Sequence, residues 1–211
     1  FTVTNIGGAT TTSIVGGGLA APFSFVGGSY PGTGGTCATS LAPTVSCTVI
    51  VEFAPIAIGA NNDTLELTYN DGVGPQLVGR DIQGSGAAPA LIAISNGLIF
   101  DFGRRAVGSS QNQILTLTNT GGVLATGMNG LGLAPPFEFT GGTYPGGGTC
   151  GTTLAASLSC TISVTFTPTA IGVVSDSTQI DYDNGVSVVS SNRGLQGEGV
   201  APALLTITQS N

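Results

Sequence analysis

The sequence predicts an all-β protein with two tandem immunoglobulin-like β-sandwich domains, each with about seven antiparallel strands. Three observations lead to this fold class. The 211 residues include 35 glycines and only 7% charged residues, a composition that suits a β-rich chain with many tight turns. Short stretches alternate apolar and polar residues between Gly, Pro and Asn turns. The chain also repeats itself over a length that suits a complete domain.

The repeat is visible when the chain is aligned with itself. The cysteine pair of the first half aligns with that of the second half at an offset of 113 positions. FTVTNIGG at 1–8 aligns with LTLTNTGG at 115–122 at an offset of 114, and PGTGG against PGGG locates the one-residue difference. GSGAAPALIAI at 84–94 then matches GEGVAPALLTI at 197–207. We therefore expect consecutive copies of one domain.

This alignment predicts repeat 1 at 1–86, repeat 2 at 87–199, and the start of a third repeat or a linker strand at 200–211. The first copy has no counterpart of GLIFDFGRRAVGSSQNQI at 97–114, so repeat 1 is expected to lack its first strand. Two explanations stay open. The sequence is an excerpt from a longer array, or repeat 1 takes the missing strand from a neighbouring molecule.

The strands of repeat 2 are expected wherever apolar residues recur at every second position. In QILTLTN this period places leucines on one face of the strand and threonines on the other, so we expect one face to be buried and the other to be exposed to solvent. The pair Asn184-Gly185 favours a two-residue type I′ hairpin. The expected strands are 91–94, 98–102, 113–119, 137–140, 159–167, 177–183 and 186–197, with a weaker one at 123–128.

The absence of histidine and lysine excludes whole classes of function. Without them there is no Ser-His-Asp or Cys-His catalysis, no histidine metal ligand and no P-loop lysine. Four arginines and a net charge of −7 make nucleic acid a poor partner. No apolar run in this fragment reaches the length of a membrane-spanning helix. We expect no enzyme activity, no cofactor and no catalytic residues.

Each repeat contains two cysteines ten positions apart, and an even, local set favours disulfides. The expected pairs are Cys37 with Cys47 and Cys150 with Cys160, each pinning a glycine-rich loop against a strand. A zinc site is the alternative, but four cysteines would have to meet across two domains to form it. Disulfides indicate an oxidising compartment outside the cytosol.

Several other strings imitate functional motifs. DFG at 101–103 lacks the lysine and histidine that accompany it in kinases, so a strand end is expected there. The glycine-rich loops at 27–35 and 141–148 lack a following helix and a lysine, which favours turns over phosphate binding. Asp181 and Asp183 are weak calcium candidates beside a turn, with solvated hairpin acids as the alternative. No metal site is otherwise expected.

The second copy carries a family likeness in DFGRRAVG, LTLTNTGG, PPFEFTGGTYPGGGTC, SDSTQIDYDNG and LQGEGVAPA. These motifs resemble the choice-of-anchor D repeats of large bacterial surface proteins, which are relatives of the ASPM–SPD-2–Hydin and MSP-like immunoglobulin-fold domains. The resemblance implies a non-enzymatic module that often occurs in tandem arrays on exported proteins. It implies no catalytic residues.

The leading functional hypothesis is an extracellular structural repeat protein, a segment of a stalk or filament on a bacterial cell surface. The linker between the copies is short, and a sparsely charged surface tolerates contact with copies of itself or with neighbouring repeats of the same array. The alternative is an adhesin or a ligand- or glycan-binding module, with the turn residues Tyr30 and Tyr144 as contact residues.

Overall fold

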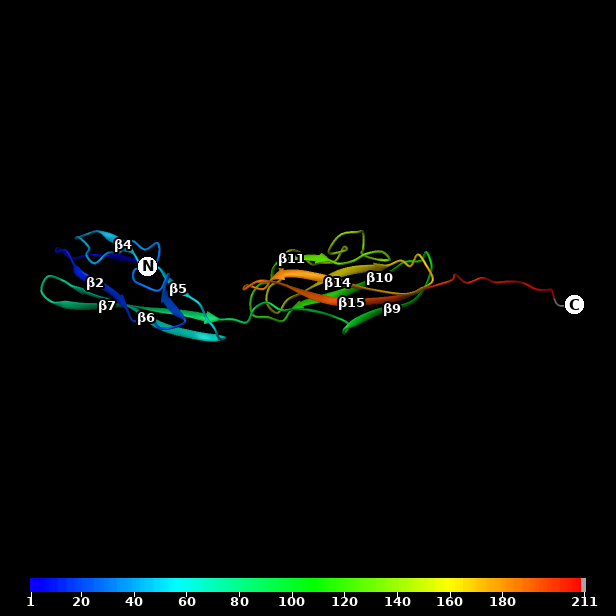
Figure 1. Cartoon of the computed structure of the whole chain (residues 1–211), viewed down its shortest axis with the longest axis horizontal. Coiled ribbons are helices and arrows are strands. Elements are labelled where there is room, and N and C mark those ends of the chain that lie inside the picture. Colours follow the sequence, from blue (N-terminus) through cyan, green and yellow to red (C-terminus); the bar gives the residue numbers. More distant parts are fainter. Residues whose placement is uncertain (210–211) are drawn as a thin grey trace. The chain divides into compact units, whose positions relative to one another are not determined.

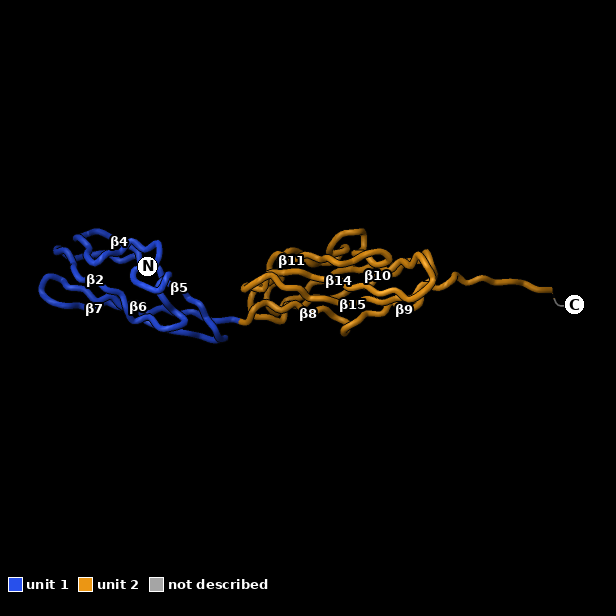
Figure 2. Tube along the Cα trace, viewed as in Figure 1, with its two compact units in different colours: residues 1–87 blue, residues 88–211 orange. Residues whose placement is uncertain are grey.

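The computed structural model describes residues 1–209. The chain forms two compact units, unit 1 at Phe1–Ala87 and unit 2 beginning at Ala88 (Figure 2). Every regular element in the described part of the chain is a β-strand (Figure 1). Among the same residues, no helix is long and apolar enough to cross a membrane.

Unit 2 is a sandwich of two four-stranded sheets, as the sequence predicted. One sheet has the order β12-β13-β10-β8 and the other has the order β11-β14-β15-β9. The strands are β8 (Ile92–Ile94), β9 (Ile99–Ala106), β10 (Gln111–Asn119), β11 (Thr126–Leu131), β12 (Phe137–Phe139), β13 (Ser159–Phe166), β14 (Gly172–Asp183) and β15 (Val188–Val200).

The core of unit 2 lies between its two sheets and follows the period of two. Leu115 and Leu117 of β10 are fully buried, whereas the residues that alternate with them are less buried. Phe102 of β9 lies in the same core and packs against Phe137 and Phe166, at ring-centroid distances of 5.8 and 5.4 Å. Strands from both sheets therefore share one continuous apolar interior.

One strand pair differs from the expected antiparallel arrangement. β9 runs parallel to β15, whereas every other pairing in unit 2 is antiparallel. The chain reverses in the short connection 107–110 between β9 and β10, and β8 is antiparallel to β10. β8 and β9 therefore run in the same direction while lying in different sheets. A pattern of apolar residues contains no information about strand direction, so the sequence did not reveal this pair.

The predicted two-residue type I′ turn at Asn184-Gly185 is wrong. Asp183 pairs with Val188, which leaves a four-residue connection, and Asn184 lacks the positive φ that this turn type requires. The Asn184 side chain instead accepts hydrogen bonds from the backbone N–H groups of Val186 and Ser187, both at 2.9 Å. This side-chain cap stabilises the longer loop.

Unit 1 contains counterparts of six strand positions of unit 2. Its sheets have the orders β1-β4, β3-β5 and β2-β6-β7. Within the described residues, unit 1 has no strand at the positions of β8 and β9, and the outer edge of β7 has no partner strand. The strands are β1 (Thr2–Thr4), β2 (Thr12–Gly17), β3 (Phe23–Phe25), β4 (Ser46–Thr48), β5 (Val51–Phe53), β6 (Gly59–Asn70) and β7 (Pro75–Gly86).

The segment 200–211, which the sequence assigned to a third repeat or a linker strand, begins at the last residue of β15. Residues 201–209 have no regular secondary structure and are exposed. Residues 210–211 lie outside the part of the chain that is described.

Candidate functional site

The glycine-rich loop of each unit is closed by a disulfide. Cys150 is bonded to Cys160 and Cys37 to Cys47, with Cα atoms 4.8 Å apart in both pairs. The backbone N–H of Cys150 also donates to the carbonyl of Thr161 at 3.1 Å, which holds the end of the loop on β13. Both predicted disulfides are thus present, and each lies within a single unit.

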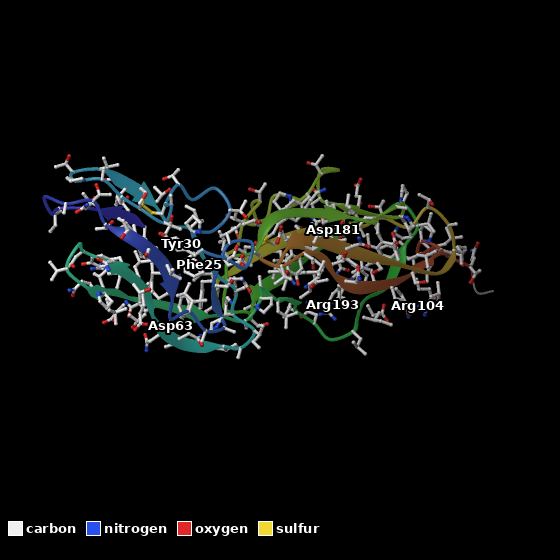
Figure 3. All side chains as sticks on the ribbon, turned by 60° about the vertical axis from the view of Figure 1, so that its left-hand side comes forward. Phe25, Tyr30, Asp63, Arg104, Asp181 and Arg193 are labelled. Atoms are coloured by element: carbon white, nitrogen blue, oxygen red, sulfur yellow. A yellow bond between two sulfur atoms is a disulfide. The ribbon has the colours of Figure 1, made fainter. Side chains whose placement is uncertain are left out.

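The two turn tyrosines occupy the same position in the two units. Tyr144 lies edge-on to Phe139 with ring centroids 5.8 Å apart, and its hydroxyl donates to the carbonyl of Gly151 at 3.2 Å. Tyr30 lies edge-on to Phe25 at the same distance (Figure 3). Burial raises the pKa of both phenols. Each ring is half-buried against its own unit and leaves only part of its surface for a ligand.

A shallow depression of about 460 Å³ lies beside Tyr144 in unit 2. Gly130 of β11 and Gly132 after it are among the residues that line the depression, and Glu138 and Thr143 supply polar groups. Sequence reasoning identified the tyrosine but not the depression, because the depression depends on how residues 129–133 and 138–144 fold against each other.

The acidic residues near the β14–β15 turn accept hydrogen bonds from the protein itself. Asp181 accepts from Ser190 at 2.6 Å and from Gln179 at 2.7 Å, and these bonds lower the pKa of its carboxyl. Asp183 accepts from the N–H of Gly185 at 2.8 Å. Over residues 1–209 there is no cluster of three or more potential metal-binding side chains.

In unit 2 a set of polar side chains holds β8 in place, and nothing in the sequence pattern predicted a role for them. Arg193 of β15 donates to the carbonyl of Ile94. The backbone N–H of Ile92 donates to the Tyr182 hydroxyl at 3.1 Å, and its carbonyl accepts from the Ser191 hydroxyl at 2.6 Å. The only indication of this role in the sequence is that Arg193 aligns with Arg80 of the first repeat.

The corresponding surface of unit 1 is open. Two adjoining depressions of about 470 and 520 Å³ share Val3, Thr4, Leu67 and Val78 in their linings, and we call them together the unit 1 groove. At its rim Arg80, the counterpart of the buried Arg193, is exposed.

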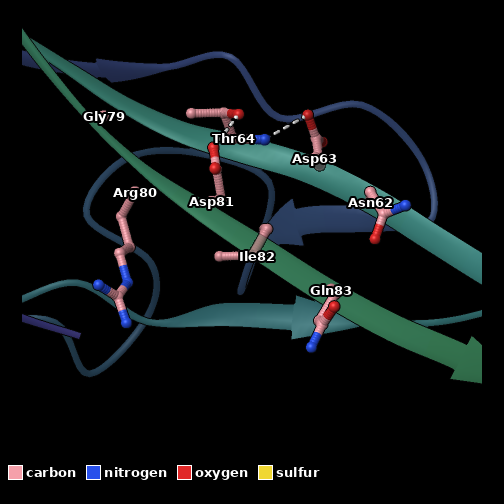
Figure 4. A pocket seen from close by; sticks show the side chains of 8 residues that line it. All are labelled: Asn62, Asp63, Thr64, Gly79, Arg80, Asp81, Ile82 and Gln83. Atoms are coloured by element: carbon pink, nitrogen blue, oxygen red, sulfur yellow. Dashed lines mark hydrogen bonds between the residues drawn. The ribbon is translucent and has the colours of Figure 1, made fainter.

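The outer face of β7 continues this open surface. A further depression of about 820 Å³ follows β6 and β7 and is lined by residues 62–64 and 79–83 (Figure 4). The hydroxyl of Thr64 donates to Asp81 across it at 2.9 Å. In unit 2 the corresponding edge of β15 is covered by β9.

The fold of unit 2 defines an immunoglobulin-like β-sandwich. In agreement with this class, residues 96–195 match the family model described as HYDIN/CFA65/VesB-like, Ig-like domain. The match supports the broader family that the sequence suggested for unit 2, and it does not single out the choice-of-anchor D branch.

Several solved structures are similar to the chain at low sequence identity. The chain is similar to the VesB protease of Vibrio cholerae (16% identity, TM-score 0.43, 51% of this chain and 31% of that chain). It is also similar to a human ASH/PapD-like domain of CEP192 (17% identity, TM-score 0.40, 53% of this chain and 87% of that chain). A protein of unknown function from Porphyromonas gingivalis W83 matches at 11% identity with a TM-score of 0.41, over 92% of this chain and 87% of that chain.

These likenesses carry no functional assignment. The chain spans less than a third of the VesB structure. No curated protein matches the chain.

Proposed function

We propose that this chain is a non-enzymatic structural segment of an exported protein, a part of a stalk or filament on a bacterial surface. The observation that carries the proposal is the presence of two tandem units with related sequences, each closed by its own disulfide. The sequence resemblance to choice-of-anchor D repeats supports the bacterial surface setting.

The disulfides support an extracellular location. Disulfides form and persist in oxidising compartments and are rare in the cytosol. None of the four cysteines is free. A protein whose cysteines are all used in loop closure within single units fits a secreted, mechanically stable module.

The side chains that are present favour a structural role over catalysis. The chain contains neither histidine nor lysine. Asp181 and Asp183, the best acidic candidates, accept hydrogen bonds within their own hairpin. The low content of charged residues supports contact with copies of the same chain or with neighbouring repeats.

Electron microscopy of the native assembly, purified from its source, tests this proposal. We expect elongated particles with a regular spacing of domains along their length. Samples treated with a reductant and a thiol-blocking reagent provide the control for the role of the disulfides. Dispersed flexible chains without regular spacing would contradict the structural role, and free thiols in unreduced, denatured protein would contradict the extracellular location.

A ligand- or glycan-binding module is the second candidate, and the depression beside Tyr144 favours it. A glycan array or a cell-binding assay on the parent chain and on Tyr144→Ala tests this function. Loss of binding in Tyr144→Ala and retention in Tyr30→Ala would support it. Equal binding by parent and Tyr144→Ala would remove it.

A further inference from the structure

Unit 2 contains three Asn-Gly dipeptides, at 96–97, 129–130 and 184–185. In such a pair the backbone nitrogen of the glycine can attack the side-chain carbonyl carbon of the asparagine, because glycine has no Cβ atom to obstruct the approach. The reaction also requires the backbone between the two groups to rotate. The three pairs have the same chemistry, so their surroundings decide which of them reacts.

The pair Asn129-Gly130 is held in a sheet. Both residues belong to β11 and pair with β14, which fixes the backbone between them. The rings of Phe139 and Tyr144 lie against Gly130, and a Cβ atom at this glycine would collide with both. Rotation of this backbone therefore requires β11 to leave its neighbours.

The pair Asn184-Gly185 is held by hydrogen bonds within its own loop. The Asn184 Oδ1 atom accepts from the N–H groups of Val186 and Ser187, both at 2.9 Å. The N–H of Gly185, which carries the attacking nitrogen, donates to the Asp183 carboxylate at 2.8 Å. Both reacting groups of this pair are thus already bonded elsewhere.

The pair Asn96-Gly97 lies in the connection between β8 and β9, and both residues are exposed. Their φ angles are 73° and 75°, the positive values that a type I′ turn requires. Among the described residues, none beyond its chain neighbours has an atom within 4 Å of the place where a Cβ atom at Gly97 would lie. The flanking residues are fixed, since Ser95 is hydrogen-bonded to β10 and Leu98 to β15. These two residues can therefore rotate without disturbing either sheet.

We propose that Asn96 is a modification site of unit 2, which converts to isoaspartate and aspartate without an enzyme. The deprotonated nitrogen of Gly97 forms a bond to Cγ of Asn96, and its proton goes to the solvent. The bond between Cγ and Nδ2 breaks, and the leaving amide takes up a proton and departs as ammonia. Water then opens the five-membered imide, at one carbonyl to give aspartate and at the other to give isoaspartate.

The conversion changes the charge and the backbone of the turn. Each event replaces a neutral amide with a carboxylate, which adds one negative charge to the net charge of −7. Isoaspartate also adds a carbon atom to the backbone between β8 and β9, which lie in different sheets. Because the loss of ammonia is irreversible, the modified fraction rises with the age of the protein. We expect the added atom to weaken the packing of β8 and so to lower the thermal stability of unit 2.

Peptide mass mapping of the folded chain during incubation at pH 7 and at pH 9 is the first test. We expect conversion at Asn96 at least about tenfold faster than at Asn129 or Asn184, because those two sites react only after local unfolding. Conversion should be faster at pH 9, since the attacking nitrogen is deprotonated. Labelling with a methyltransferase specific for isoaspartate separates the two products.

The same chain, reduced and unfolded in denaturant, is the control for the effect of the fold, and all three sites should then convert at similar rates. Asn96→Gly removes the reacting amide and retains a residue that adopts positive φ, so the aged variant should lose most of the isoaspartate label. Asn184→Gly is the matched control and should label as the parent does. Calorimetry should show a lower unit 2 transition in the aged parent and none in aged Asn96→Gly.

Three results would overturn the inference. The first is conversion at Asn96 that is no faster than at the other two sites in the folded chain. The second is equal labelling of aged parent and aged Asn96→Gly. The third is a denatured chain in which Asn129 and Asn184 react as slowly as in the folded one. A unit 2 transition that stays unchanged after conversion would refute the effect on β8.

Discussion

Units 1 and 2 share a sequence pattern but differ in one place: unit 2 contains the β8–β9 segment, and the described residues of unit 1 contain no counterpart of it. In unit 2 the β8–β9 segment covers the edges of both sheets, and Leu115, Leu117 and Phe166 are fully buried. In unit 1 the counterparts Phe1, Val3 and Phe53 are exposed or half-buried. The burial of a side chain in this fold is therefore set by the neighbouring strand as much as by the residue itself.

Arg193 and Arg80 show that the neighbouring strand also sets the burial of a charged side chain. Arg193 is 6% exposed and donates to a backbone carbonyl of β8, and burial lowers the pKa of its guanidinium. Arg80 has the same place in its repeat and is exposed. A strand carbonyl supplies a partner for the buried cation in unit 2, and solvent supplies it in unit 1.

The largest expected effect on the difference between the units comes from replacing Phe102, which has no counterpart in unit 1. Phe102→Ala leaves a cavity between Phe137 and Phe166, so we expect unit 2 to lose about 3–5 kcal/mol of unfolding free energy. Calorimetry should show a shift of one transition only. Ile99→Ala, on the same strand and 61% exposed, is the control with little effect. A shift of both transitions would show that the units do not unfold independently.

The disulfides should contribute equally in the two units, because both close loops of ten-residue separation. Replacing the pair Cys150 and Cys160 by alanine should lower the unfolding free energy of unit 2 by about 3 kcal/mol. The same change at Cys37 and Cys47 should lower that of unit 1 by a similar amount. Denaturant titration of both variants measures the two effects, and a clearly larger loss in unit 1 would show that the open groove increases its dependence on the loop.

Loss of the hydroxyl should destabilise the protein at Tyr144 but not at Tyr30. Tyr144→Phe removes the hydrogen bond to Gly151 and should cost about 0.5–1.5 kcal/mol. The Tyr30 hydroxyl is buried without a partner among the described residues, so Tyr30→Phe should be neutral or stabilising. Thermal unfolding of the two variants provides the comparison. Equal destabilisation would indicate that the Tyr30 hydroxyl has a partner in solution.

The smallest expected effect concerns the hairpin loops. Asp71 in unit 1 occupies the position of Asn184 in unit 2, and the N–H groups of Gly74 and Val73 lower its pKa. A carboxyl whose pKa is lowered by folding stabilises the folded state above its unfolded pKa of about 3.9, and this stability is lost as pH falls through the folded value.

Asp71→Asn should therefore leave stability at pH 7 almost unchanged and make unit 1 less sensitive to acid. Unfolding of parent and variant at pH 7 and at pH 2.5 measures this difference. An unchanged acid sensitivity would exclude Asp71 as a contributor.

Much of the fold was visible in the sequence, because the period of two and the cysteine spacing act over short distances along the chain. The sandwich and both disulfides follow from these local patterns. The parallel β9–β15 pair does not, since strand direction has no sequence signature. The role of Arg193 was also missed, because its partner is a backbone carbonyl 99 positions away, and a carbonyl is the same in every residue.

The glycine-rich loop has a consequence for protein engineering. A Cβ atom at Gly146 would collide with the carbonyl of Ser163, and one at Gly148 with that of Thr161, so both positions are closed to larger residues. In unit 1 the corresponding positions are Gly32 and Gly35, and the extra residue of this longer loop lies between them. The two repeats thus differ in loop length between these two glycines. This part of the loop is therefore a suitable insertion site for an epitope or a fluorophore tag.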